Sequence, residues 1–171
     1  LILFNQQSNG SIITENGRIV GSRLIGQQFT NSNHLHSRPS ANNYKNNFSG
    51  NTNYAYKSNE LRTYIQQRSK DFKTINKNNA PDLNILSESA SGLDPHITYK
   101  GATAQIKRIS SSLNVAENEV KELIDKHAKP MIAGLFGEKI VNVVELNLDL
   151  NILRNKNAKK TWTRWNLKTD S

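Results

Sequence analysis

The segment from Ile140 to Leu150 carries the pattern that most constrains the fold of this chain. In its second half, apolar residues at 144, 146, 148 and 150 alternate with polar residues at 145, 147 and 149. Alternation with a period of two predicts a half-buried strand, because successive strand side chains point to opposite faces of a sheet. The same residues also allow a strand that is followed by a turn of helix.

A hairpin is predicted near the other end of the chain. Ser11–Thr14 and Arg18–Gly21 are rich in β-branched residues, and an Asn-Gly pair at 16–17 separates them. Asn-Gly favours the tight turns that join antiparallel strands. Ser22–Phe29 is expected to continue as a third short extended segment, with a bend at Gly26.

Three helices are predicted between these strands. Apolar residues recur at helical spacing from Ser58 to about Lys77, from Tyr99 to Ser111 and from Val115 to His127, and Asn114 is the expected N-cap of the last. Asp82–Leu86 is predicted to be a short strand or turn, and Ser89–His96 a loop. The pattern indicates a single α+β domain in which a small antiparallel or mixed sheet, made of the N-terminal hairpin and the C-terminal strand, packs with about three helices.

Two regions lie outside this pattern. The asparagine-rich stretch 31–58 has little apolar area to offset the entropy of ordering and is predicted to be a long loop. The tail 154–171 holds six Lys or Arg residues and one Asp of a chain whose net charge is +9, with Trp162 and Trp165 between the cations. Such a tail can contact lipid or single-stranded nucleic acid, but a C-terminal helix packed on the body, or a dispensable extension, is the simpler interpretation.

The residues give little sign of catalysis. His34 and His36 make a two-histidine pattern that can bind a metal, but a solvated pair in a loop is the simpler interpretation, because no third ligand stands at a useful spacing. Asp94 precedes His96 as a carboxylate that orients an imidazole would, although a turn cap explains it as well. The chain has no cysteine and no Gly-x-Ser-x-Gly, Gly-x-Gly-x-x-Gly or Walker motif, so we predict no catalytic residue and no metal site.

No segment has the roughly 20 consecutive apolar residues needed to span a bilayer. The opening residues Leu1–Phe4 are either a core strand or the end of a longer apolar helix.

The run Ser-Gly-Leu-Asp-Pro-His-Ile at 91–97 resembles the signature of the potassium-transporting ATPase C chain, KdpC. Further blocks resemble the same family in the same order along roughly residues 1–153. They are the segment Phe4–Ser11, Gly21–Phe29, Arg38–Ala41 with Tyr44 and Ser49-Gly50, Gln105 with Arg108, Leu123–His127, and Gly137 with Val141–Leu148.

The resemblance implies an accessory subunit of a high-affinity, ATP-driven potassium uptake pump. Its partners would be the channel-like and P-type ATPase subunits (KdpA, KdpB and KdpF), with no nucleic acid expected. The subunit would assist assembly and raise the affinity of the catalytic subunit for ATP without hydrolysing ATP itself. ATP is the only cofactor implied, and only through the resemblance.

The resemblance also implies a division of the chain. Residues 1–10 would be the segment after a single membrane helix, 11–153 the domain outside the cytoplasmic membrane, and 154–171 a tail without a counterpart in the family. Where some members carry a Leu-Ser-x-x-Gln nucleotide signature, this chain has Val115–Glu119, and the Glu119 carboxylate would repel phosphate.

We select eight polar residues as candidates for the interaction surface. The loop and helix residues among them are polar where a core does not require them or match the family pattern, and the two asparagines interrupt an apolar strand. They are Ser91, Gly92, Asp94, His96, Gln105, Arg108, Asn142 and Asn147.

Overall fold

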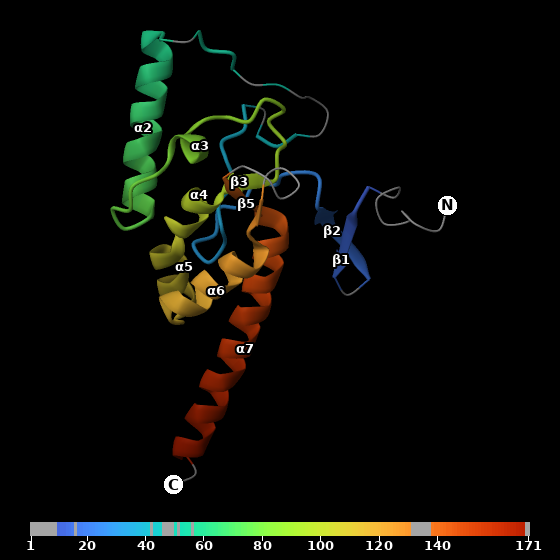
Figure 1. The fold of residues 1–171 in the computed structure, drawn as a ribbon. Coiled ribbons are helices and arrows are strands. Elements are labelled where there is room, and N and C mark those ends of the chain that lie inside the picture. Colours follow the sequence, from blue (N-terminus) through green and yellow to red (C-terminus); the bar gives the residue numbers. More distant parts are fainter. Residues whose placement is uncertain are drawn as a thin grey trace.

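The computed structural model describes residues 10–15, 17–41, 43–45, 50, 52–55, 57–130 and 138–169. Within this part of the chain, two small antiparallel sheets combine with helices, which confirms the predicted α+β class (Figure 1). The N-terminal hairpin and the C-terminal strand lie in separate sheets rather than in one. The opening residues Leu1–Phe4 and the asparagine of the predicted Asn-Gly turn lie outside the described residues.

The predicted hairpin is present. Strand β1 (Ile12–Glu15) pairs with β2 (Arg18–Ser22), and Gly17 at the turn has a φ of +76° that favours glycine. The extended segment expected at Ser22–Phe29 does not form a strand, because the chain turns directly after β2 and then follows an irregular path. The hairpin therefore stands beside the helical body without a third strand (Figure 1).

The second sheet holds the signature segment. Its strands are β3 (His96–Thr98), β4 (Lys129–Pro130) and β5 (Lys139–Asn142), in the order β3-β5-β4. Because β5 lies in the middle, it pairs with β3, which belongs to the signature segment, on one side and with β4 on the other.

The chain leaves β5 directly into a long helix, α7 (Val143–Thr169). The prediction of a strand up to Leu150 is therefore wrong, and the alternative of a strand followed by helix is nearer, although the helix is much longer than one turn. The physical reason is a second periodicity in the same residues. Val143, Leu146, Asn147 and Leu150 form one buried helical stripe.

Helix α2 (Asn59–Ile75) confirms the first predicted helix, and the side chain of Ser58 caps it by accepting a hydrogen bond from the Leu61 amide at 3.1 Å. None of its residues is fully buried, so α2 lies at the edge of the body (Figure 1). The segment predicted to be a strand or turn forms the one-turn helix α3 (Leu83–Leu86), capped by Asp82.

The second predicted helix is split into α4 (Tyr99–Thr103) and α5 (Ile106–Leu113). The third, α6, spans Glu117–His127. Asn114 does not cap α6 but ends α5 in a left-handed conformation, with a φ of +53°.

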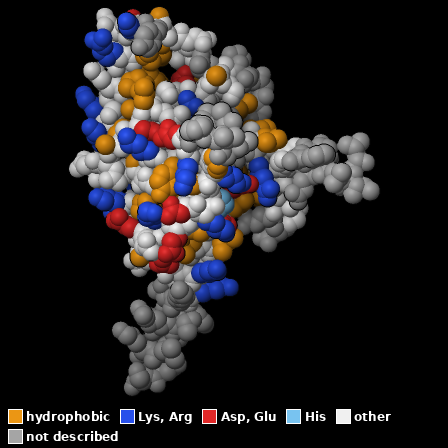
Figure 2. Space-filling model, viewed as in Figure 1, with side chains coloured by type: hydrophobic (Ala, Val, Ile, Leu, Met, Phe, Trp, Pro, Cys, Tyr) orange, Lys and Arg blue, Asp and Glu red, His pale blue; other side chains and the backbone are white. Residues whose placement is uncertain are grey.

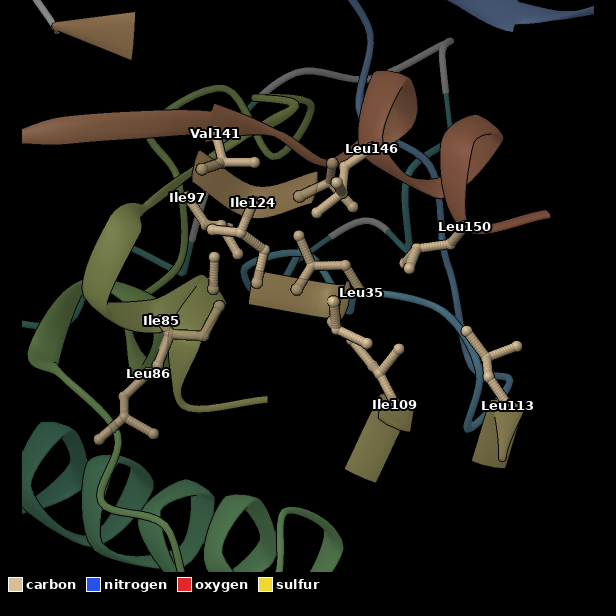
Figure 3. Packing of buried hydrophobic residues seen from close by; sticks show 13 residues of the cluster. Leu35, Ile85, Leu86, Ile97, Ile109, Leu113, Ile124, Val141, Leu146 and Leu150 are labelled. Atoms are coloured by element: carbon tan, nitrogen blue, oxygen red, sulfur yellow. The ribbon is translucent and has the colours of Figure 1, made fainter. Parts of the chain in front are cut away.

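One core joins the helices to the second sheet (Figure 3). It is formed by side chains from α3 to α7 and from β3 and β5, together with Leu35 from the asparagine-rich loop. The described part of that loop contains no helix or strand, as predicted, yet Leu35 is 0% exposed. The members of the core are Leu35, Ile85, Leu86, Ile97, Ala102, Ile109, Leu113, Val120, Ile124, Val141, Val143, Leu146 and Leu150.

Candidate interaction site

The signature loop before β3 has a fixed backbone. Gly92 has a φ of +69°, which favours glycine, and the Ser91 hydroxyl accepts a hydrogen bond from the Leu93 amide at 3.1 Å. The Gly50 amide donates to the Ser91 carbonyl at 3.1 Å. Ser91 and Gly92 therefore set the backbone of the signature loop, and the Ser91 carbonyl also links this loop to the asparagine-rich loop.

Asp94 makes both contacts that its sequence context allowed, the turn cap and the contact with an imidazole. Its Oδ1 accepts from the backbone amide of His96 at 3.0 Å, as a turn cap does, and lies 3.0 Å from His96 Nδ1, as an orienting carboxylate does. The Arg38 guanidinium lies 3.7 Å from its other oxygen. Burial alone would raise the pKa of Asp94, but the hydrogen bonds from His96 and the charges of His96 and Arg38 lower it below its ordinary value.

Arg38 links the signature loop to the residues after α3. Its guanidinium donates to the carbonyls of Ser87 and Glu88 at 3.2 and 2.7 Å, in addition to the ion pair with Asp94. The Tyr44 hydroxyl in turn donates to the Arg38 carbonyl. Arg38 thus holds the Asp94 carboxylate at the oxygen that does not contact His96.

Gly26 brings the segment after the hairpin against the same loop. Its amide donates to the Leu93 carbonyl at 2.6 Å, and a Cβ at this position would lie 2.9 Å from the Asp94 carbonyl oxygen. Only glycine allows this approach without movement of the backbone.

Asn142 continues the contact toward the hairpin. It pairs with His96 across β3 and β5, its Nδ2 donates to the Arg23 carbonyl at 2.8 Å, and its Oδ1 caps α7 by accepting from Val144 N and Glu145 N at 3.0 and 3.1 Å. The Arg23 side chain forms an ion pair with Glu145 at 3.2 Å.

A strip of polar side chains therefore runs from the signature loop to the hairpin. We call it the signature strip, and its members are Arg23, Arg38, Asp94, His96, Lys129 and Glu145. It joins opposite charges, in contrast to the predominance of lysine and arginine on much of the face shown in Figure 2.

Gln105 and Arg108 are buried beneath the asparagine-rich loop rather than on the surface. Arg108 donates to the carbonyls of Ser32 and His34 at 2.6 and 2.9 Å, to Asn76 Oδ1 at 2.8 Å and to Gln105 Oε1 at 2.7 Å. Within the described residues it forms no ion pair, and burial lowers its pKa to about 10. The two side chains can therefore affect a surface contact only through the loop that they hold in place.

Gln105 holds the same loop by a second set of bonds. Its Oε1 accepts from the His36 amide at 2.8 Å, and its Nε2 donates to the His36 carbonyl at 3.2 Å. Asn147 makes the equivalent pair with Leu35, at 2.7 and 3.0 Å. The buried side-chain amides of Asn147 and Gln105 therefore bond to backbone groups of the loop, which have no strand partner.

His34 and His36 are half-buried and hydrogen-bonded, so the expected solvated pair is wrong. His34 Nε2 lies 3.0 Å from Asn151 Oδ1, and His36 Nε2 lies 3.0 Å from the Asn31 carbonyl. Burial and the nearby Arg108 charge lower the pKa of His36 to about 4. No group of three potential metal ligands occurs among the residues that the structure describes.

The family model described as "K+-transporting ATPase, c chain" matches residues 1–152. This chain belongs to the KdpC family. A relative from Caldanaerobacter subterraneus, named potassium-transporting ATPase KdpC subunit, is 41% identical over 87% of this chain and 79% of its own length. Relatives of the same name from Synechocystis and Koribacter versatilis are 39% and 37% identical over 88% of this chain, and over 82% and 79% of their own lengths.

KdpC membership makes the signature strip a candidate for function, since Asp94 and His96 belong both to the strip and to the segment that resembles the family signature. Across the described residues, no helix combines the length and apolarity that a membrane span requires. Glu119, at the position where we expected phosphate repulsion, accepts from the Ala116 amide at 3.2 Å and so caps the start of α6.

Several residues that shape this region were not selected from the sequence, among them Arg23, Lys129 and Glu145 of the strip. Arg38 and Gly26 had a signal, because both belong to blocks that resemble the family. Leu35 had none, because one leucine in a polar loop does not show whether it reaches the core.

Proposed function

We propose that this KdpC-family chain is an accessory subunit of an ATP-driven potassium uptake pump and that the signature strip docks on the pump's other subunits, the KdpA, KdpB and KdpF chains. In this role it assists assembly and raises the affinity of the catalytic subunit for ATP, without hydrolysing ATP. A single membrane helix before Phe4 would hold the domain on the outer side of the cytoplasmic membrane.

The observation that carries the proposal is the rigid support beneath the strip. Asp94 is held by His96 and Arg38, and the backbone behind it is held by Gly26. Asn142 fixes the neighbouring Arg23 carbonyl. A surface that is ordered before binding loses less conformational entropy on docking, which is what a permanent subunit contact requires.

An effect on ATP affinity has to pass through the complex. A hydrocarbon layer of roughly 30 Å would separate an outer domain from cytoplasmic nucleotide. The domain would therefore act by stabilising the pump conformation that binds ATP, as a coupling between two sites. Calorimetric titration of ATP into the isolated domain should show no saturable heat, and micromolar binding would contradict this route.

Charge reversal tests the docking surface. In the pump complex, Arg23→Glu reverses a charge of the strip, whereas Arg62→Glu makes the same change on the exposed edge helix α2. We expect Arg23→Glu to lower the yield of co-purified complex about ten-fold, equivalent to about 1.4 kcal/mol, and Arg62→Glu to leave it unchanged. Equal yields for the two variants would refute docking through the strip.

The basic tail supports a second candidate, a module that binds anionic lipid or nucleic acid. The observation in its favour is that α7 continues as a helix to Thr169, beyond the body of the domain (Figure 1). Deletion of residues 158–171 separates the two, because it spares Asn157, which contacts the body. If the pump complex still forms after the deletion, the result supports the accessory subunit. If binding to anionic lipid or nucleic acid is lost with the tail and falls steeply with salt, the result supports the module.

A further inference from the structure

The β1–β2 hairpin exposes an unusual share of large aliphatic side chains. Ile12, Ile19 and Leu24 are 51%, 70% and 61% exposed, and Val20 is exposed beside them. A single exposed aliphatic residue is ordinary, but several on one small element indicate a surface that contacts something other than water.

The strand register places two of these residues on one face. Thr14 pairs with Ile19, and Ile12 lies two residues before Thr14 in the same strand, so Ile12 and Ile19 share a side of the ribbon. Ile13 points to the other side and is buried. The face that carries Ile12 and Ile19, which we call the bare face, is therefore exposed, whereas Ile13 on the other face is buried.

An arginine flanks the bare face. Arg18 pairs with Glu15 at the turn end of the ribbon, next to Ile19 along β2, and is exposed there. Aliphatic side chains with arginine at their edge suit the head-group region of a bilayer, where the apolar part enters the acyl boundary and the guanidinium meets anionic phosphate.

The size of the hairpin favours lipid over a protein partner. Its strands contain 4 and 5 residues. A stable protein interface uses roughly 20–30 residues on each side. A shallow contact with a bilayer needs no such area when the chain is already tethered to the membrane.

The tether rests on the proposed function. If a membrane helix ends near Phe4, residues 5–11 span at most about 25 Å even when fully extended. The hairpin then cannot move farther than that from the surface of the bilayer, and its local concentration at the lipid is high.

We propose that the bare face of the β1–β2 hairpin, formed by Ile12 and Ile19, rests in the head-group layer of the membrane that carries the pump, together with the exposed Leu24 that follows β2 and with Arg18 at the turn. This contact sets the orientation of the domain on the membrane, and it is separate from docking through the signature strip.

The cysteine-free chain allows a direct test, since one introduced cysteine is the only labelling site. Ile19→Cys, labelled with the environment-sensitive dye NBD, is compared with Leu83→Cys. Leu83 is 68% exposed, close to the 70% of Ile19, but lies on α3, on the other side of the body from the hairpin (Figure 1). Both proteins, residues 1–171, carry an N-terminal histidine tag and are tethered to phosphatidylcholine–phosphatidylglycerol vesicles that contain nickel-chelating lipid.

We expect a blue shift and a rise in NBD emission at position 19 on tethering, and neither change at position 83. The same comparison without residues 158–171 removes the basic tail as a source of the shift. Unchanged emission at position 19, or equal changes at both positions, would overturn the proposal. A shift without vesicles that grows with protein concentration would show that a second copy covers the face and would also overturn it.

Two checks make the result decisive. Circular dichroism must show wild-type unfolding for the labelled protein, and Leu24→Cys replaces Ile19→Cys if it does not. The vesicle experiment contains no other pump subunit, whereas the Arg23→Glu experiment depends on them, so failure of the lipid contact and failure of the proposed function are distinguishable.

Discussion

Asn147 holds Leu35 by both of its backbone groups. The Asn147 Oδ1 accepts from Leu35 N at 2.7 Å, and its Nδ2 donates to the Leu35 carbonyl at 3.0 Å. The pair joins α7 to an irregular loop 112 residues earlier in the chain, and it places the Leu35 side chain in the core (Figure 3).

Asn147→Ala removes this pair and leaves two buried backbone groups without partners. Each such group costs about 1–3 kcal/mol, so for two groups the free energy of unfolding should fall by about 2–6 kcal/mol. Urea denaturation monitored by circular dichroism measures it. Asn118→Ala is the matched control, because Asn118 is exposed on α6 and should change stability by no more than about 0.5 kcal/mol. Similar losses for both variants would contradict the role of Asn147.

Gly26→Ala should disturb the signature loop. The added methyl group would lie 2.9 Å from the Asp94 carbonyl oxygen and 3.0 Å from that of Leu93, and backbone atoms cannot yield as a flexible side chain can. We expect a loss of about 1–3 kcal/mol in urea denaturation. At Gly21 the added methyl group meets only the end of the Gln27 side chain, so Gly21→Ala should cost less. The reverse order would show that the loop, not the side chain, gives way.

Asn114 tests the left-handed end of α5. Its φ of +53° is tolerated by asparagine, is easy for glycine and is unfavourable for alanine. Asn114→Ala should lower the free energy of unfolding by about 1 kcal/mol, while Asn114→Gly should stay within about 0.5 kcal/mol of the wild type. If alanine is as stable as glycine here, α5 does not end in this conformation in solution.

His36 should make the domain sensitive to mild acid. Its pKa is lowered from 6.5 to about 4 in the folded chain, first by burial and then by the Arg108 charge. Between these values the unfolded chain binds the proton and the folded chain does not, so stability falls as the pH drops from 6.5 toward 4. The total effect is at most about 3 kcal/mol.

The comparison variant is His36→Gln, which keeps a donor for the Asn31 carbonyl but does not titrate. Its free energy of unfolding should vary less between pH 5 and 6.5 than that of the wild type. This window avoids Asp94 and Asp149, whose pKa values are lowered and which therefore titrate at lower pH. Identical slopes for the two proteins would exclude His36 as the cause.

The elements with a local signal could be predicted from the sequence. The hairpin follows from Asn-Gly between β-branched runs, and α2 from its apolar spacing and the Ser58 cap. The segment after β5 could not, because its residues satisfy two periods at once. Alternation predicts that Asn147 faces solvent, whereas the helix buries it against Leu35, a partner that no local pattern reveals.

The candidate site shows the same limit. The signature loop could be located from the sequence, because glycine, proline and aspartate mark a turn wherever they occur together. The placement of Gln105 and Arg108 could not. Their match to the family pattern made them candidates for the interaction surface, but their partners are backbone groups of a loop about 70 residues away, and only the folded chain shows that these groups need partners.

Helix α7 begins inside the core and ends outside it. Its first residue donates to the Pro95 carbonyl of the signature loop, and Asn157, farther along, donates to the Leu113 carbonyl at the end of α5. The helix beyond that residue extends for about 18 Å. Because α7 is one continuous helix, a partner that bound the tail would be linked without a flexible joint to Val143, whose amide donates to the loop that carries Asp94 and His96.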